Sequence, residues 1–219
     1  MKTLIFSDTH LTDEFEPEKY DFLKKIISGA DSVVINGDFW DGFKTTFDAF
    51  MASSWQKLFP LLKSRKTFYI YGNHDDPSKS DERVSFFSDH QGDRYEFIHG
   101  KNTFYIWHGH ISDFLFGGTE PKWYLKIITM MYDLVEKYGL ELFGKRSRRF
   151  FIDKRLSDYL LRRYQSNLPE DTYLICGHSH WSSFNEQKRY VNLGDIQNGY
   201  ASYAVVTDGN VELIQTQYA

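Results

Sequence analysis

The chain has 219 residues, of which 41% are hydrophobic and 18% are aromatic. This composition suits one folded domain with a full core and excludes an extended disordered protein. The net charge of −4 gives no reason to expect a nucleic-acid-binding protein. Cys176 is the single cysteine, which excludes an intrachain disulfide and fits a reducing compartment. The sequence has no apolar run of about 20 residues and no recognisable signal peptide, so we expect a cytoplasmic protein.

The first half of the chain predicts an alternating β-α-β-α-β unit. Three short apolar runs are typical of strands buried on both faces: residues 4–6, 33–35 and 68–71. A helix with Pro17 near its start and Gly29 beyond its end separates the first two. Its inner face is predicted from four apolar residues: Phe22, Leu23, Ile26 and Ile27. A second helical stretch covers about residues 46–62, with Pro60 at its end or at a kink. This order predicts a parallel sheet with crossover helices.

The second half of the chain predicts strands that are mostly antiparallel. Residues 95–98 and 103–107 flank a Gly-Lys-Asn turn and form a predicted hairpin. Four further strand-like runs follow along the chain: residues 173–176, 190–193, 203–207 and 211–214. A parallel half and an antiparallel half together predict two sheets packed face to face, with helices outside.

A helical insertion is predicted at about residues 112–168 of a single domain that spans residues 1–219. Residues 123–138 and 152–160 carry apolar side chains at helical spacing. Residues 145–163 contain eight Lys or Arg and two Asp, a local charge of +6. A solvated face is the simplest interpretation of this basic stretch, and contact with an anionic partner or substrate is the alternative. The residues expected to make such a contact are Arg146 and Arg149.

Five short motifs each follow a strand-like run. In chain order they are Asp8-Thr9-His10, Gly37-Asp38 with Asp41 three residues on, Gly72-Asn73-His74-Asp75, His108-Gly109-His110 and Gly177-His178-Ser179-His180. Strands that run in one direction would bring these motifs to one sheet edge, where carboxylate, amide and imidazole ligands converge. The glycines before the ligands suggest sharp turns from strand to loop. A site with two metal ions needs such ligands and one carboxylate that bridges the ions.

The motifs D-x-H, G-D-x-x-D, G-N-H-D, H-G-H and G-H-x-H resemble, in this order, those of the calcineurin-like metallophosphoesterase family. The resemblance implies an α/β fold, a four-layer α-β-β-α sandwich of two mixed sheets. It also implies a binuclear hydrolase that cleaves a phosphate ester or pyrophosphate bond with a metal-activated hydroxide. The ligands implied for the first ion are Asp8, His10, Asp38 and His180. Those implied for the second ion are Asp38, Asn73, His108 and His178, so that Asp38 is the bridge.

The same resemblance implies that His74 is a catalytic residue, which stabilises the transition state or protonates the leaving oxygen, and that Asp75 orients its ring. Asp41 would lie behind the ligands or cap a turn. His108 and His110 both remain candidates for one ligand position. The family's usual ligand precedes the glycine, which favours His108 and leaves His110 for the substrate. We expect two divalent ions, for which Mn²⁺ is the preferred choice and iron, zinc or cobalt are the alternatives.

Some features resemble one branch of that family, the UDP-2,3-diacylglucosamine pyrophosphohydrolases. The shared features are the helical insertion and two segments, Gly37-Asp38-Phe39-Trp40-Asp41 and Asn192-Leu193-Gly194-Asp195. The departure is His110, which stands where that branch has aspartate. The branch implies a phosphorylated nucleotide-lipid substrate and peripheral contact with the inner face of a membrane through the basic and aromatic insertion. Two alternatives are a nuclease or general phosphodiesterase, with residues 145–163 along a phosphate backbone, and a non-catalytic interaction scaffold.

Overall fold

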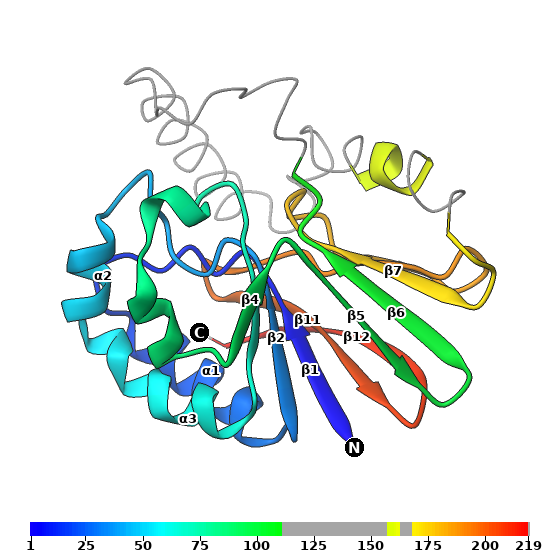
Figure 1. Cartoon of the computed structure of the whole chain (residues 1–219), viewed down its shortest axis with the longest axis horizontal. Helices are drawn as coiled ribbons and strands as arrows, with labels where there is room; N and C mark the ends of the chain where they lie inside the picture. The colour runs from blue at the N-terminus through cyan, green and yellow to red at the C-terminus, as the bar shows by residue number, and fades with distance from the viewer. Residues whose placement is uncertain (111–156, 163–167, 219) are drawn as a thin grey trace.

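The computed structural model describes residues 1–110, 157–162 and 168–218. The strands in these ranges form two mixed sheets that pack face to face, and helices cover the outer face of the larger sheet (Figure 1). The predicted α/β fold with two mixed sheets is therefore confirmed. Nothing in the structure tests whether residues 1–219 form a single domain, which stays a prediction.

The larger sheet has seven strands in the order β10-β11-β1-β2-β3-β4, with β12 paired to β11. Their bounds are β1 Lys2–Phe6, β2 Ser32–Asn36, β3 Phe68–Ile70, β4 His90–Gly92, β10 Ile196–Gln197, β11 Tyr200–Thr207 and β12 Asn210–Gln217. Strands β1 to β4 are parallel, as the alternating unit predicts. The hairpin β11–β12 lies antiparallel along β1 and therefore belongs to this sheet.

The smaller sheet has five strands in the order β5-β6-β7-β9-β8. Their bounds are β5 Arg94–His99, β6 Asn102–Trp107, β7 Thr172–Cys176, β8 Ser183–Asn185 and β9 Tyr190–Asn192. The predicted hairpin is the antiparallel pair β5–β6, but β6, β7 and β9 are parallel to one another. Most strand pairs of the second half are antiparallel, as predicted, but they do not form a separate antiparallel half, because each sheet is mixed. The long insertion between β6 and β7 supplies the crossover that a parallel pair needs.

The helices with both ends described are α1 Pro17–Ser28, α2 Phe47–Ala52 and α3 Phe59–Ser64, with 3₁₀ turns η1 Ser54–Leu58, η2 Pro77–Lys79 and η3 Glu82–Phe86. Residues 157–162 are also helical. Helix α1 begins and ends close to the predicted positions. The single helix predicted at 46–62 is instead three short pieces. Pro60 lies in the first turn of α3, where its missing N–H costs no hydrogen bond, so it starts a helix rather than ending one.

Alternate residues of the central strands face different layers of the core. In β2, Val33 and Ile35 pack against the helices, whereas Val34 faces the smaller sheet. A third cluster lies on the outer face of the smaller sheet, where Leu160 of the helical segment 157–162 packs on Leu174, Tyr190 and Cys176. Cys176 is therefore buried among apolar side chains. These contacts give the helix-sheet-sheet-helix layering within the described ranges.

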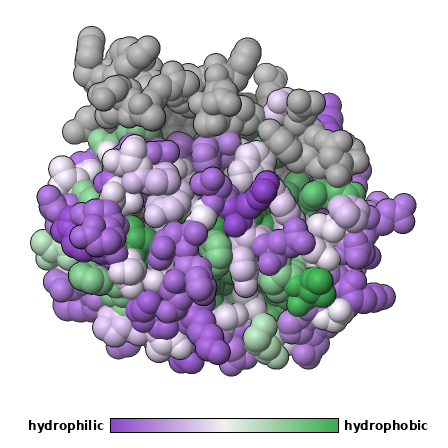
Figure 2. All heavy atoms as spheres, viewed as in Figure 1, coloured by the Kyte–Doolittle hydropathy of each residue, from purple (hydrophilic) through white to green (hydrophobic). Residues whose placement is uncertain are grey.

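The face drawn in Figure 2 is mostly hydrophilic over the described residues, with apolar side chains scattered among polar ones. No helix within residues 1–110, 157–162 and 168–218 is long and apolar enough to span a bilayer. The predicted helix at 123–138 and most of that at 152–160 lie outside the described residues, as do Arg146 and Arg149.

Candidate metal centre

The five motifs meet where the two sheets come together, just beyond the ends of β1, β2, β3, β6 and β7. Within the larger sheet, the Asp8 backbone N–H donates to the Gly37 carbonyl (3.1 Å). Within the smaller sheet, the Gly177 N–H donates to the His108 carbonyl (2.9 Å). The His178 N–H then joins the two sheets by donating to Asp8 Oδ2 (3.0 Å). The candidate site therefore lies at a seam that both sheets build.

Five predicted ligands have a left-handed backbone, with φ between 47° and 65°: Asp8, His10, Asp38, His178 and His180. Residues other than glycine rarely adopt this conformation, which costs roughly 1–3 kcal/mol at each position. Backbone hydrogen bonds hold the loops in this form, such as that from the His10 N–H to the Asp38 carbonyl (3.0 Å). Strain of this kind is typical of functional sites, where side chains must converge whatever the local preference.

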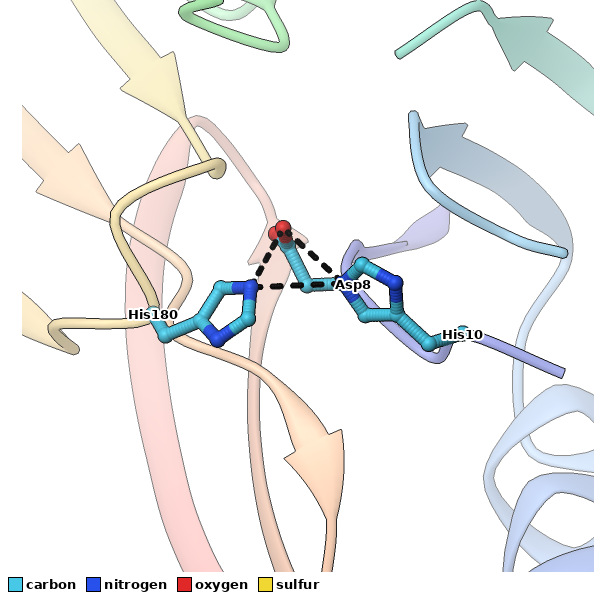
Figure 3. Close-up of side chains that lie close together, drawn as sticks. All are labelled: Asp8, His10 and His180. Carbon is cyan, nitrogen blue, oxygen red and sulfur yellow. Dashed lines mark hydrogen bonds and ion pairs between the residues drawn. The ribbon is translucent and has the colours of Figure 1, made fainter. Parts of the chain in front are cut away.

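The first group of possible ligands comprises Asp8, His10 and His180, whose ligand atoms all lie within 4.8 Å of one another (Figure 3). His180 Nε2 lies 3.4 Å from Asp8 Oδ1 and 3.3 Å from His10 Nε2. Asp8 Oδ1 is buried and has no hydrogen-bond partner among the described residues, whereas Asp8 Oδ2 is used by the His178 N–H. One carboxylate oxygen and two imidazole nitrogens thus face the same small volume, as they would around one ion.

The second group comprises Asp38, His108 and His178, again with ligand atoms within 4.8 Å of one another. His108 Nδ1 donates to the Asn36 carbonyl (2.7 Å), which leaves Nε2 to face Asp38 Oδ2 at 3.3 Å. A backbone carbonyl on one imidazole nitrogen is a common way to orient the other toward a metal. His108 Nε2 has no hydrogen bond within the described residues.

Asn73 and His110 are the remaining candidates near the second group. Asn73 Oδ1 is buried without a hydrogen-bond partner in the described part of the chain, as expected of an amide oxygen meant for a cation. The His110 ring centroid lies 5.5 Å from that of His108 and 6.5 Å from that of His178, and His110 belongs to neither group. The geometry therefore places His108, rather than His110, against Asp38.

Asp38 connects the two groups. Its Oδ2 lies 3.3 Å from His108 Nε2 of the second group and 3.8 Å from His10 Nε2 of the first. Its Oδ1 accepts a hydrogen bond from the His74 backbone N–H (2.9 Å). Burial alone would raise the pKa of this carboxyl, but the nearby charges of His108 and His74 hold it well below the usual value. Asp38 is therefore an ionised carboxylate with one oxygen facing ligands from both sheets.

Asp41, not Asp75, is the carboxylate that touches the His74 ring. Asp41 Oδ1 lies 2.9 Å from His74 Nδ1, and Asp41 Oδ2 lies 3.5 Å from His10 Nδ1. The Asp75 carboxylate instead accepts three backbone N–H groups: those of Asp38 (3.0 Å), Phe39 (2.7 Å) and Gly72 (2.6 Å). The expected orienting role of Asp75 is thus wrong, because its oxygens satisfy N–H groups that the sharp loop turns leave unpaired.

His10, Asp41 and His74 form a third group that is close enough to hold a cation. However, the Lys44 ammonium forms an ion pair with Asp41 Oδ2 (3.3 Å), so this oxygen already has a cationic partner. Burial lowers the pKa of His178 to about 3, and the charge of His108 adds to this effect, so His178 is neutral near pH 7 and able to ligate a metal. The first two groups are therefore the candidate metal ligands, and Asp41 contacts two of the imidazoles, those of His10 and His74.

Gly72 is required for space rather than for backbone freedom. A Cβ at this position would overlap Asp38 Oδ1 and lie 2.6 Å from the Asp38 backbone nitrogen. We expect Gly72→Ala to displace Asp38 and to lower kcat/KM on the order of 10²-fold, together with the bound metal per chain. Elemental analysis and initial rates measure both. Gly29→Ala is the matched control, because a Cβ there meets no atom closer than 3.7 Å. Full metal content in Gly72→Ala would contradict this account.

Two supporting residues lie outside the five motifs. Asn192, at the end of β9, donates from Nδ2 to Ser179 Oγ (2.9 Å) and to the Gly177 carbonyl (3.3 Å), and so holds the loop that carries His178 and His180. Asn36 orients His108 through its carbonyl. The sequence signal that could have identified them is a polar residue at the end of an apolar strand. Both Asn36 and Asn192 have this position, and both are fully buried.

One protein family and several solved structures are similar to this chain. A sequence profile of the calcineurin-like phosphoesterase superfamily domain matches residues 1–208. No curated protein sequence matches the chain. Similar solved structures include the phosphoesterase YfcE from E. coli, with 17% identity, TM-score 0.49 and 100% of both chains covered. A Vps29 mutant from Entamoeba histolytica has 15% identity, TM-score 0.47 and 100% of both chains covered. A metallophosphoesterase from Sphaerobacter thermophilus has 14% identity and TM-score 0.47, with 100% of this chain and 90% of that chain covered.

Proposed function

Because the chain belongs to the calcineurin-like phosphoesterase superfamily and is a hydrolase of phosphate esters, we propose that it works with two divalent ions bridged by Asp38. One ion would be held by Asp8, His10, Asp38 and His180, and the other by Asp38, Asn73, His108 and His178. The observation that carries this proposal is the position of Asp38 Oδ2, which lies within 3.8 Å of His10 Nε2 and 3.3 Å of His108 Nε2.

The donor atoms suit such ions. Asp8 Oδ1, Asn73 Oδ1 and His108 Nε2 are buried without hydrogen-bond partners among the described residues, and leaving polar atoms in this state costs free energy unless a ligand satisfies them. The mixture of carboxylate, amide and imidazole favours Mn²⁺, and iron, zinc and cobalt accept the same donors. A bound pair of ions supplies a water of lowered pKa and neutralises charge on the phosphoryl oxygens.

In this proposal His74 acts as the general acid. Asp41 holds its Nδ1, and its Nε2 points toward the centre, 4.0 Å from Asp38 Oδ2. Burial lowers the pKa of His74, but the charges of Asp38 and Asp41 outweigh burial and raise it above the ordinary value. The protonated ring can then donate from Nε2 to the leaving oxygen of the ester.

For the substrate we propose a UDP-linked glycolipid such as UDP-2,3-diacylglucosamine, cleaved at its pyrophosphate bond. The support is the resemblance of the motif-flanking residues to that branch of the family. One of the shared segments, Asn192 to Asp195, lies against the site, where Ser7 Oγ donates to the Gly194 carbonyl (3.4 Å). Most of residues 145–163 lie outside the described ranges, and membrane contact through this stretch stays a prediction.

A comparison of substrates tests both the proposed reaction class and the proposed glycolipid substrate. We expect the Mn²⁺-loaded protein to hydrolyse UDP-2,3-diacylglucosamine faster than 4-nitrophenyl phosphate by orders of magnitude in kcat/KM, because binding energy from the remote groups can be used in the transition state. Equal or faster turnover of the aryl ester would reject the glycolipid and leave the reaction class intact. The absence of turnover on phosphomonoesters, diesters and nucleotide sugars alike would reject the proposed catalysis itself.

A further inference from the structure

We infer that Lys79 is a positioning residue for His74 and that it acts together with Phe43. The inference rests on the proposed function, in which His74 protonates the leaving oxygen. Lys79 is not part of any motif, and no carboxylate of the described residues lies within ion-pair distance of its ammonium. Its hydrogen bonds and ring contact are directed instead at the loop that carries His74.

A short capped turn sends the Lys79 side chain back along its own loop. Asp76 caps η2 by accepting the Ser78 N–H at 2.9 Å, and the Lys79 N–H donates to the Asp76 carbonyl at 2.9 Å. The Lys79 ammonium then donates to the carbonyls of Asn73 (2.9 Å) and His74 (3.1 Å). The side chain therefore fixes the two peptide groups that carry a metal ligand and the general acid.

The same ammonium reaches an aromatic ring of the neighbouring loop. Lys79 Nζ lies 3.8 Å from the centre of the Phe43 ring, which is a close cation–π contact. The Phe43 ring in turn meets the His74 ring edge to face, with centroids 4.5 Å apart and an angle of 66°. Ammonium, phenyl ring and imidazole thus form one continuous set of contacts.

Backbone contacts join the same two loops. The Gly42 N–H donates to the His74 carbonyl (3.1 Å), and the Phe43 N–H donates to Asp41 Oδ1 (3.0 Å), the oxygen that faces His74 Nδ1. Asp41 fixes one nitrogen of the imidazole, whereas Phe43 restricts rotation of the ring. Lys79 holds Phe43 in place, because a partly exposed ring without this contact would be free to change rotamer.

Ordering a lysine side chain costs rotamer entropy, which a solvated surface lysine avoids. The cost is understandable if the ordered ammonium keeps Nε2 of His74 aligned with the leaving oxygen. An enzyme that relies on a well-placed acid should depend on it more when the leaving group is poor. Loss of alignment should therefore affect poor leaving groups more than good ones, whereas general loosening of the fold would affect both alike.

The test compares hydrolysis of a phenyl phosphate ester, whose phenol is a poor leaving group, with that of the matching 4-nitrophenyl phosphate ester, whose nitrophenol is a good one. We expect Lys79→Met, loaded with Mn²⁺, to lose about tenfold more kcat/KM on the phenyl ester than on the nitrophenyl ester, a part of the roughly 10²–10⁴-fold due to a general acid. Phe43→Leu should show the same selective loss, and Lys79→Arg should restore part of the rate. Bound manganese and melting temperature should match the wild type.

Lys57→Met is the matched control, because Lys57 Nζ also lies over an aromatic ring, that of Phe15 at 5.1 Å, outside the motif-bearing loops. It should match the wild type on both esters. Equal losses of Lys79→Met on both esters, a loss of manganese or unchanged rates would overturn the role of Lys79 while the wild type still hydrolyses both. A manganese-loaded wild type that hydrolyses neither these two esters nor phosphodiesters and nucleotide sugars would instead overturn the proposed function, and the inference about Lys79 with it.

Discussion

Replacing Asp38 by alanine should abolish binding of both metal ions and lower kcat/KM on the order of 10³-fold or more, above the loss from one oxyanion donor. The reason is that one oxygen of this carboxylate faces a ligand of each group, at 3.3 Å from His108 Nε2 and 3.8 Å from His10 Nε2. Elemental analysis of the purified variant should find metal and activity lost together. Asp38→Asn, which keeps the size but not the charge, should retain at most a weakly held ion.

The control is Asp48→Ala, which removes a largely exposed carboxylate paired with Arg83. Exposed ion pairs contribute little to stability, so this variant should keep full metal content and activity. If Asp38→Ala retained one tightly bound ion and a substantial rate, Asp38 would not be shared, and the two ligand groups would be independent sites.

His74→Ala should keep both metal ions and lose roughly 10²–10⁴-fold in kcat. His74 lies in neither of the two groups assigned to metal ligation, and its Nδ1 is occupied by Asp41 at 2.9 Å. Metal content and kcat measured on the same preparation separate the two effects. Loss of metal in His74→Ala would show that His74 is a ligand and would reject its assignment as the general acid.

Asp41→Asn tests the same assignment through pH. The charges of Asp38 and Asp41 raise the pKa of His74 against the lowering effect of burial, so the protonated acid persists to a higher pH than it otherwise would. Removing the Asp41 charge should move the alkaline decline of kcat to lower pH. In the His74→Ala background the substitution should change the rate little, because residues that act as a unit are not additive. An unchanged pH profile would contradict the coupling.

Much of the fold could be predicted because strand and helix signals are local. The apolar runs that become β1, β2 and β3 and the proline that starts α1 are visible in a few consecutive residues. The placement of the C-terminal hairpin was not visible, since pairing with β1 depends on which sheet edge is free after the rest of the chain has folded. Likewise, Pro60 is compatible with either end of a helix, and only packing against the core decides between them.

Part of the candidate site could likewise be predicted from the sequence, and part could not. The motifs could identify donor types and strand ends, and the structure does bring Asp8, His10, Asp38, His108, His178 and His180 together. They could not tell which carboxylate orients His74, because Asp41 and His74 are 33 residues apart and meet only through loop approach. Asp75, the next residue in sequence, points to backbone N–H groups instead.

By itself, the sequence determined the kinds of ligand, the order of the strands that present them and the family that shares them. Those properties follow from residue chemistry and from periodicity over short distances. The resemblance of the motifs already implied that Asp38 bridges both ligand groups. The tertiary structure alone decided that Asp41 contacts the His74 ring and that Lys79 and Phe43 pack beside it. Such contacts join loops from distant parts of the chain, as between Asp8 and His178, 170 residues apart. Their distances depend on how two sheets pack, which no local pattern encodes.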